Sequence, residues 1–288
     1  MIPARFIDTG LLAPALFHAT YAGVAQAMAR DAAPVVMWGS STPHVSLGQS
    51  QHRDAELAPE LDVPALTRPL GGGAVWIDES QHCFVLIAPL TMAPVRPVDW
   101  YRWGLAPALE TFRHFGLRVT RREQDLWLDG RKIAGSGAAT IGRAAVLASS
   151  FLLRFPAARF ARCIASPSPT FRRWLLSGLR QAMTDWQSHQ RPPAQEALRF
   201  AFRAAVTTTL QWQLKDSGLS AAEQAAREEM LIELREFEPA GGARQVKDGI
   251  KLNAATFLYQ RRAAGVSELS LVREGAVVRS LRGSLKTI

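Results

Sequence analysis

The order of the hydrophobic segments constrains the fold of this chain most strongly. Between residues 34 and 155, short runs rich in aliphatic, β-branched and aromatic residues recur, as is typical of β-strands. The expected strands are 34–39, 63–66, 74–77, 83–89, 117–121, 126–135 and 145–155, with one helical insert at 99–116. Because helical patterns dominate only after residue 166, the order predicts an α+β domain with helices packed on a mixed, largely antiparallel sheet.

Capping signals locate the helices. Residues 11–31 have helical spacing, and Ser168 followed by proline predicts the start of a second helix. Ser220 and Glu223 form a capping box for another helix that ends near residue 236. The segment 193–214 lies between these two signals and has the apolar spacing of a helix throughout.

The C-terminal residues are expected to form a small accessory region. Residues 238–249 are rich in glycine and polar side chains and predict a loop or linker. Alternation around Glu274-Gly275 predicts a β-hairpin. We therefore divide the chain into a main domain, 1–237, and an accessory region, 238–288.

Charge and composition narrow the classes of partner. The chain has 34 basic and 25 acidic residues and a net charge of +9. Its arginines are scattered in pairs and do not form a stripe between stacking aromatic residues, so we expect no nucleic-acid partner; an acidic protein explains the charge equally well. No apolar run is long enough to span a membrane. Asp8 and His18 interrupt the apolar N-terminal segment, which we interpret as mature sequence.

Two motifs carry the candidate chemistry. In "QDLWLDGRKIAG", a two-residue turn at 129–130 predicts a hairpin that pairs Leu126 with Ile133. The same register puts Asp125 and Lys132 on one face as diagonal neighbours. A carboxylate and an ammonium group placed in this way either form a surface ion pair or share a ligand, such as a metal-bound phosphate.

The second motif is "RPLGGGAVWIDES", residues 68–80. Its three glycines, 71–73, either mark a tight turn or leave backbone N–H groups open to an anion, with Arg68 supplying positive charge. No Gly-Lys-Ser/Thr sequence follows, so the motif is not a P-loop. A strand follows where a helix should begin, which excludes a dinucleotide fingerprint.

Together the motifs point to a known family. "RPLGGGAVWIDESQHCFVLIAP" (68–89), followed by "DLWLDGRKIAGSGAA" (125–139), resembles the lipoate-protein ligase and octanoyltransferase family, whose catalytic fold is shared with biotin-protein ligases. "VVMWGSSTPHVSLGQSQ" (35–51) resembles a further strand and turn of that family. The resemblance implies a biotin/lipoate-ligase-like catalytic domain over residues 1–237.

The resemblance also implies a reaction. ATP with Mg²⁺ activates lipoate or octanoate as an acyl-adenylate, and the acyl group passes to a lysine of a lipoyl carrier. The carrier is a 2-oxo-acid dehydrogenase E2 domain, a glycine-cleavage H protein or a specialised lipoyl-binding protein. Lys132 is the implied catalytic residue and Asp125 the metal-linked one; the implied adenylate-binding residues are Arg68, Gly71, Gly72, Gly73, Ala74, Gly135 and Ser136. Because Cys83 and Cys163 form neither a disulfide framework nor a zinc spacing, we expect a cytoplasmic location.

The sequence departs from the family pattern at four places and leaves alternatives open. Thr67 replaces an arginine, Leu70 a serine or threonine, and Gln124 an asparagine; a histidine pair usual near residue 150 is also missing. One alternative is an ATP-independent acyl transferase with Cys83 or Cys163 as nucleophile. Another is a non-catalytic paralogue that only binds the ligand. The six histidines show no metal spacing and are expected to be structural or solvated.

Overall fold

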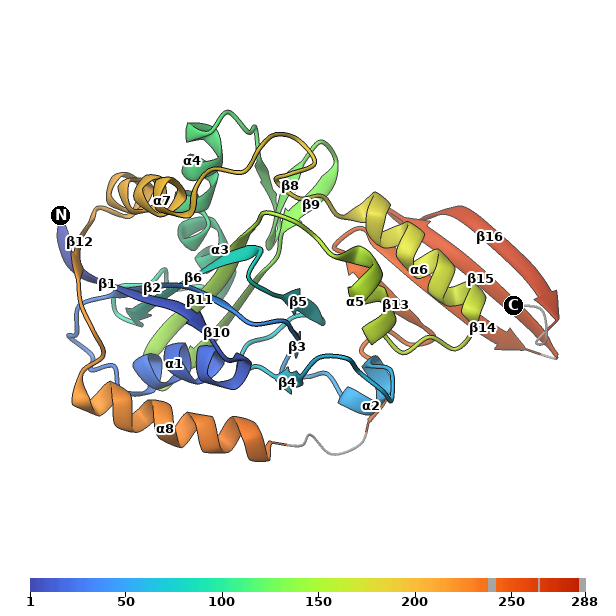
Figure 1. Ribbon diagram of the computed structural model, residues 1–288, viewed down its shortest axis with the longest axis horizontal. Coiled ribbons are helices and arrows are strands. Elements are labelled where there is room, and N and C mark those ends of the chain that lie inside the picture. Colours follow the sequence, from blue (N-terminus) through green and yellow to red (C-terminus); the bar gives the residue numbers. More distant parts are fainter. Residues whose placement is uncertain (238–241, 264, 285–288) are drawn as a thin grey trace.

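A six-stranded mixed sheet forms the centre of the protein (Figure 1). The computed structural model describes residues 1–237, 242–263 and 265–284. The strand order is β10–β11–β6–β2–β1–β12, formed by β1 (Ile2–Leu12), β2 (Val35–Ser41), β6 (Gln81–Pro89), β10 (Ser136–Ile141), β11 (Ala144–Leu152) and β12 (Trp212–Asp216). β1 runs parallel to β2 and β12, and the other neighbours are antiparallel. The predicted α+β class is confirmed.

Helices cover both faces of this sheet (Figure 1). The helices of the described chain are α1 (Pro14–Gln26), α2 (Arg53–Glu56), α3 (Pro97–Gly104), α4 (Ala106–His114), α5 (Ala157–Cys163), α6 (Pro169–Ala182), α7 (Gln195–Leu210) and α8 (Ala221–Glu236). α1 packs on one face, with α8 outside it; α3, α4 and α7 pack on the other. A Cβ atom added at Gly23 of α1 would lie 2.5 Å from the backbone nitrogen of Arg227, so glycine lets α1 and α8 approach closely.

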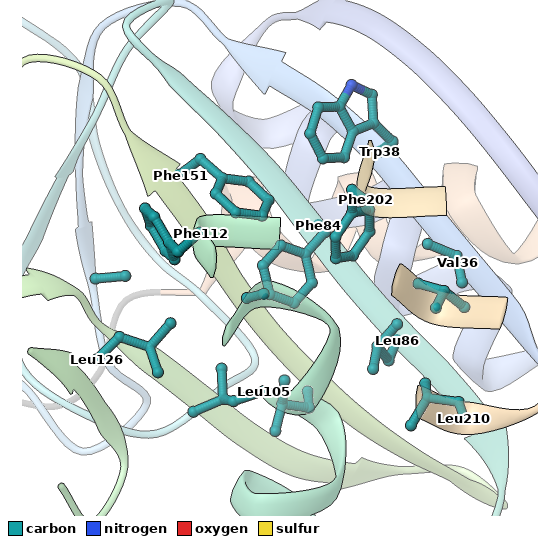
Figure 2. Packing of buried hydrophobic residues seen from close by; sticks show 14 of the residues in the cluster. Val36, Trp38, Phe84, Leu86, Leu105, Phe112, Leu126, Phe151, Phe202 and Leu210 are labelled. Carbon is teal, nitrogen blue, oxygen red and sulfur yellow. The ribbon is translucent and has the colours of Figure 1, made fainter. Parts of the chain in front are cut away.

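Strand alternation divides the core into two layers. Val35 and Met37 of β2 face α1, whereas Val36 and Trp38 face the α3–α4–α7 side. On that side, aromatic rings of β2, β6, β11 and α7 pack together (Figure 2). The centroids of Phe84 and Phe202, for example, lie 4.7 Å apart. The central strands β2 and β6 are therefore buried on both faces.

Two small sheets lie beside the central one and carry both sequence motifs. One has the order β4–β3–β5, from β3 (His44–Leu47), β4 (Ala65–Thr67) and β5 (Val75–Ile77). The other has the order β7–β8–β9, from β7 (Thr120–Arg122), β8 (Asp125–Leu128) and β9 (Arg131–Ala134). The glycine run joins β4 to β5, and the Asp-Gly turn joins β8 to β9.

The C-terminal sheet has four antiparallel strands, β13 (Gly249–Asn253), β14 (Thr256–Ala263), β15 (Val266–Arg273) and β16 (Ala276–Ser284). The predicted hairpin at Glu274-Gly275 is confirmed, and both turn residues have positive φ angles, 51° and 82°. β13 and β14 were not predicted. The sheet packs on α6, where the side chain of Leu252 lies close over Gly178. The predicted loop 238–249 falls partly outside the described residues, and β13 begins at Gly249.

The structure corrects three expectations about local structure. The segment 99–116 forms two helices, α3 and α4, and α5 was not predicted. The segment 193–214 is helical only to Leu210, because Gln211 adopts a left-handed conformation with φ of 58°. Trp212 then begins β12, which pairs with the unpredicted strand β1. Both predicted caps are confirmed: Ser168 accepts a hydrogen bond from the Phe171 nitrogen, and the Ser220 capping box is complete.

Among the helices described, none is both long and apolar enough to cross a membrane.

Candidate functional site

The β8–β9 hairpin forms one side of the candidate site. Its turn is confirmed, and Asp129 and Gly130 both have positive φ angles, 48° and 74°. The register differs from the prediction, because a bulge between Leu126 and Trp127 pairs Leu126 with Ala134 and not with Ile133. An unpaired residue in one strand increases local twist and redirects the following side chains.

Asp125 and Lys132 project from this hairpin and contact each other. The Lys132 ammonium lies 2.9 Å from Asp125 Oδ1, and the two side chains are only 17% and 10% exposed. A Cβ atom added at Gly135 would lie 2.9 Å from the same ammonium nitrogen. The chain thus holds the lysine between a carboxylate and a bare stretch of backbone, so its position is tightly defined.

The glycine run forms the opposite side. Gly72 has a φ of 100°, and a Cβ atom at Gly48 would overlap the carbonyl group of Gly72. Two glycines from separate segments therefore allow the loop to fold back on the end of β3. Nothing described lies within 4 Å of the space that a Cβ atom of Gly71 would fill, so the loop leaves room there for a ligand.

The buried side chain of Arg68 holds the glycine loop in place by hydrogen bonds. Its guanidinium donates hydrogen bonds to the carbonyl oxygens of Ser46 (2.8 Å), Gly71 (2.7 Å) and Gly73 (3.0 Å). The side chain is buried, and burial lowers the pKa of Arg68 to about 10. No carboxylate in the described chain forms an ion pair with it. Arg68 therefore acts on the loop directly, and its unbalanced charge lies beneath the glycines.

β10 joins the two sides. A Cβ atom at Gly137 would lie 3.2 Å from the carbonyl oxygen of Gly71 and 3.5 Å from the Leu70 Cβ. Ser136, at the start of β10, donates a hydrogen bond to the Gln124 carbonyl next to Asp125. The glycine loop, β10 and the Asp125–Lys132 pair are therefore contiguous, although Gly71 and Asp125 are more than fifty positions apart in the sequence.

Leu70 points away from this site into the core. It is 2% exposed and packs in the same cluster as Tyr21, Ile77 and Cys83. Its backbone remains part of the loop, because the Leu70 carbonyl accepts a hydrogen bond from Gln49. The apolar replacement thus strengthens the packing under the loop and removes no polar group from the ligand side.

A segment from the C-terminal region reaches the same loop, which sequence reasoning missed. The Gln245 side-chain oxygen lies 3.9 Å from the position that a Cβ atom of Gly73 would take. The Gln245 nitrogen donates to Glu56, and Arg244 donates to the carbonyl groups of Ala55 and Ala165. The sequence contains no signal for this contact, since about 170 residues separate its two sides.

The histidines are less isolated than expected. His18 Nε2 lies 3.2 Å from His44 Nε2, and His18 Nδ1 lies 3.0 Å from the Tyr21 hydroxyl. Burial lowers the pKa of His18 well below its usual value and that of His44 to about 4. Both rings are therefore neutral at pH 7 and form a polar cluster in the core beside Arg68.

Neither cysteine lies in an environment that would activate its thiol as a nucleophile. Cys83 and Cys163 are free thiols and both are buried. Burial raises the pKa of Cys83 to about 12 and also raises the pKa of Cys163. Since the thiolate is the reactive form, these environments disfavour attack by either residue.

Asp125 was predicted to be the metal-linked residue, and its surroundings offer few further ligands. Within the described ranges, no group of three or more His, Cys, Asp or Glu side chains could hold an ion. Asp125 Oδ1 contacts Lys132, and Oδ2 has no protein partner in the described chain. Mg²⁺ commonly uses only one or two protein carboxylates together with substrate phosphates, so this single oxygen fits a metal that arrives with a nucleotide.

A comparison with protein families matches the part of the chain that carries both motifs. The family model for the lipoyl protein ligase A/B catalytic domain matches residues 18–206, which include both motifs. The chain belongs to this family. Membership supports an enzyme of the ligase or transferase kind. No curated protein sequence matches the chain significantly.

Solved structures share the fold. A bipartite archaeal lipoate protein ligase from Thermoplasma acidophilum, described with its E2 lipoyl domain, has a TM-score of 0.74 at 16% identity, covering 81% of this chain and 93% of its own. A putative lipoate protein ligase from T. acidophilum with bound lipoic acid and a lipoate-protein ligase A bound with ATP each give 0.69 at 14% identity, covering 81% and 95%. At these identities the likeness concerns the fold.

Proposed function

We propose that the protein is a lipoate-protein ligase. It activates lipoate or octanoate with ATP and transfers the acyl group to a lysine of a lipoyl carrier domain. The observation that carries this proposal is the junction at Gly137, where the open glycine loop meets the strand pair bearing Asp125 and Lys132. Residues 1–237 form the catalytic domain in this proposal, and 238–288 form the accessory region.

The first step is adenylation. A carboxylate oxygen of the acid attacks the α-phosphorus of ATP, a new C–O–P linkage forms, and the bond to the β-phosphate breaks to release pyrophosphate. Negative charge grows on the phosphate oxygens during this step. The Lys132 ammonium and the backbone N–H groups of 71–73 would stabilise it, each fixed donor contributing about 3 kcal/mol.

The second step is transfer. The neutral amine of the carrier lysine attacks the acyl carbonyl carbon, an amide C–N bond forms, and AMP leaves with the electron pair of the broken C–O bond. The amine loses its proton to solvent or to the departing phosphate. Gly73 and Ala74 border the space in which the carbonyl oxygen gains charge.

Asp125 serves two purposes in this mechanism. It fixes the Lys132 ammonium by their 2.9 Å contact, and its free Oδ2 would hold the Mg²⁺ that accompanies the nucleotide. The metal, when bound, neutralises phosphate charge and makes pyrophosphate a better leaving group. Gly135 and Ser136 keep the backbone close to this pair.

The raised pKa values of Cys83 and Cys163 support the ligase over a transferase with a cysteine relay. Solved relatives described with an E2 lipoyl domain, lipoic acid and ATP support the carrier and both small substrates. The free thiols are compatible with the reducing cytoplasm, where we place the reaction.

The test measures the mass of an apo-carrier after incubation with the protein, lipoate and Mg²⁺, with and without ATP. We expect a lipoyl mass increase only with ATP, together with pyrophosphate release. Transfer from an acylated carrier without ATP would identify a transferase. Lipoate binding with no modified carrier under any condition would identify a non-catalytic paralogue.

A further inference from the structure

A cavity outside the candidate site is lined by residues of β9, α5 and α6 and of the segments next to them. Its volume is about 400 Å³. Three arginines from three different elements line it: Arg131 of β9, Arg159 of α5 and Arg180 of α6. We call this cavity the arginine hollow.

The arginine hollow has a net positive charge, because, among the described residues, three arginines and a single carboxylate line it. Asp185 is the acidic residue in its lining, but both carboxylate oxygens accept hydrogen bonds, from the Phe155 nitrogen at 2.7 Å and from Ser188 at 2.6 and 2.9 Å. In the described chain, Arg131 and Arg180 have no carboxylate partner. Arg159 is 3.5 Å from Asp62, a half-exposed pair that is weakened by solvent.

The arginine hollow is linked to the proposed catalytic strand but is separate from its reactive face. Arg131 precedes Lys132, so alternation along β9 sends the two side chains to opposite faces. The Thr184 nitrogen, in the lining, donates to the Lys132 carbonyl at 2.8 Å. A molecule bound in the hollow would therefore lie on the other side of β9 from the nucleotide. It would be held at a fixed distance from Lys132 and would not compete with the nucleotide.

The lining favours a protein surface over a small anion. Arginine, aromatic and methionine side chains are enriched in protein interfaces, and the three arginines share the hollow with Phe155, Pro156 and Met183. Arg180 is exposed and the side chain of Arg159 is 42% exposed. Exposed charges attract a charged protein partner from solution, whereas tight binding of a phosphate needs buried donors.

We propose that the arginine hollow docks acidic side chains of the carrier protein and so presents its lysine to the acyl-adenylate. This inference rests on the proposed ligase function, because it assigns a surface to the partner of that reaction. The net charge of +9 is consistent with a partner of opposite sign.

The test compares Arg131→Glu, Arg180→Glu and the double variant with Arg30→Glu. Arg30 is exposed, lies outside the hollow and has no ion pair in the described chain, so it carries the same charge change elsewhere. Two reactions are measured: lipoate-dependent exchange of pyrophosphate into ATP, which needs no carrier, and acyl transfer to the apo-carrier.

We expect each hollow variant to raise the KM for carrier about tenfold and the double variant more, with exchange unchanged. A higher salt concentration should also raise the KM of the wild type for carrier. Arg30→Glu should behave as wild type. An unchanged carrier KM would overturn the proposal. A raised KM for ATP in exchange would also overturn it, and would assign the hollow to a small phosphate.

Failure of the proposed function would look different. In that case the wild-type protein would show no exchange, while carrier binding could still be measured directly by titration. Loss of carrier binding in the double variant, restored by a Glu→Lys change on the carrier, would then support the docking surface alone. Equal carrier binding by wild type and double variant would reject it.

Discussion

Lys132 and Asp125 are the residues on which the proposed chemistry depends. Lys132→Ala should lower the rate of adenylate formation by about two to three orders of magnitude, because it removes a fixed donor to the developing phosphate charge. The change should also lower the melting temperature, because the side chain is only 17% exposed and its loss leaves the mostly buried Asp125 carboxylate without its partner. Pyrophosphate exchange and a thermal scan measure the two effects. Wild-type exchange in this variant would remove Lys132 from the mechanism.

Alanine substitutions at two glycines of the loop region should have different effects, one on stability and the other on ligand binding. Gly48→Ala places a methyl group against the Gly72 carbonyl and should destabilise the protein by about 1–3 kcal/mol. Gly71→Ala meets nothing described within 4 Å, so its stability should stay near wild type while adenylate formation falls. Urea unfolding and pyrophosphate exchange test the pair. Equal loss of stability in both variants would contradict the proposed open face of the loop.

The buried histidine pair should make stability depend on pH. Burial holds the pKa of His18 and His44 below the ordinary 6.5, His44 at about 4, with Arg68 beside both and Asp78 and the Thr42 carbonyl facing His44. The unfolded chain therefore binds protons first, and stability present above pH 6.5 falls as the pH drops toward 4.

The decrease should reach up to about 1.4 kcal/mol per pH unit for each histidine. Urea unfolding between pH 7 and pH 5 measures it. His18→Gln should flatten the dependence, whereas His114→Gln, at an exposed position, should leave it unchanged. Identical slopes for the wild type and His18→Gln would show that the pair does not titrate with folding.

At the scale of elements, the segment that follows residue 241 fastens the C-terminal sheet to the glycine loop. Arg244→Ala removes hydrogen bonds to Ala55 and Ala165. We expect faster hydrogen exchange across 242–249 and a higher KM for lipoate, because Gln245 then no longer covers Gly73. Arg262→Ala, which loses one exposed contact to Pro167, is the matched control. Unchanged exchange in Arg244→Ala would show that the segment is held by other contacts.

The same scale shows why some elements could be predicted and others not. The hairpin turns at 129–130 and 274–275 and the caps at Ser168 and Ser220 depend on neighbouring residues, so the sequence indicates them. β12 is different, because Trp212 and Leu214 also fit the helical spacing before them. Only pairing of this segment with β1 stabilises it as a strand. The bulge that moves Leu126 opposite Ala134 likewise arises from packing and has no local sequence signal.

At the scale of the whole molecule, the sequence alone determined the fold class, both motif turns and the family resemblance, because these depend on hydrophobic period, turn chemistry and short fixed spacings. Only the tertiary structure shows how the two motifs are placed relative to each other. It turned Arg68 inward under the glycine loop, joined Asp125 to Lys132 and brought Gln245 over Gly73. It also gathered Arg131, Arg159 and Arg180 around one cavity. Gln245 and Gly73, like the three arginines, are far apart along the chain, and only the packing of complete elements can place such residues together.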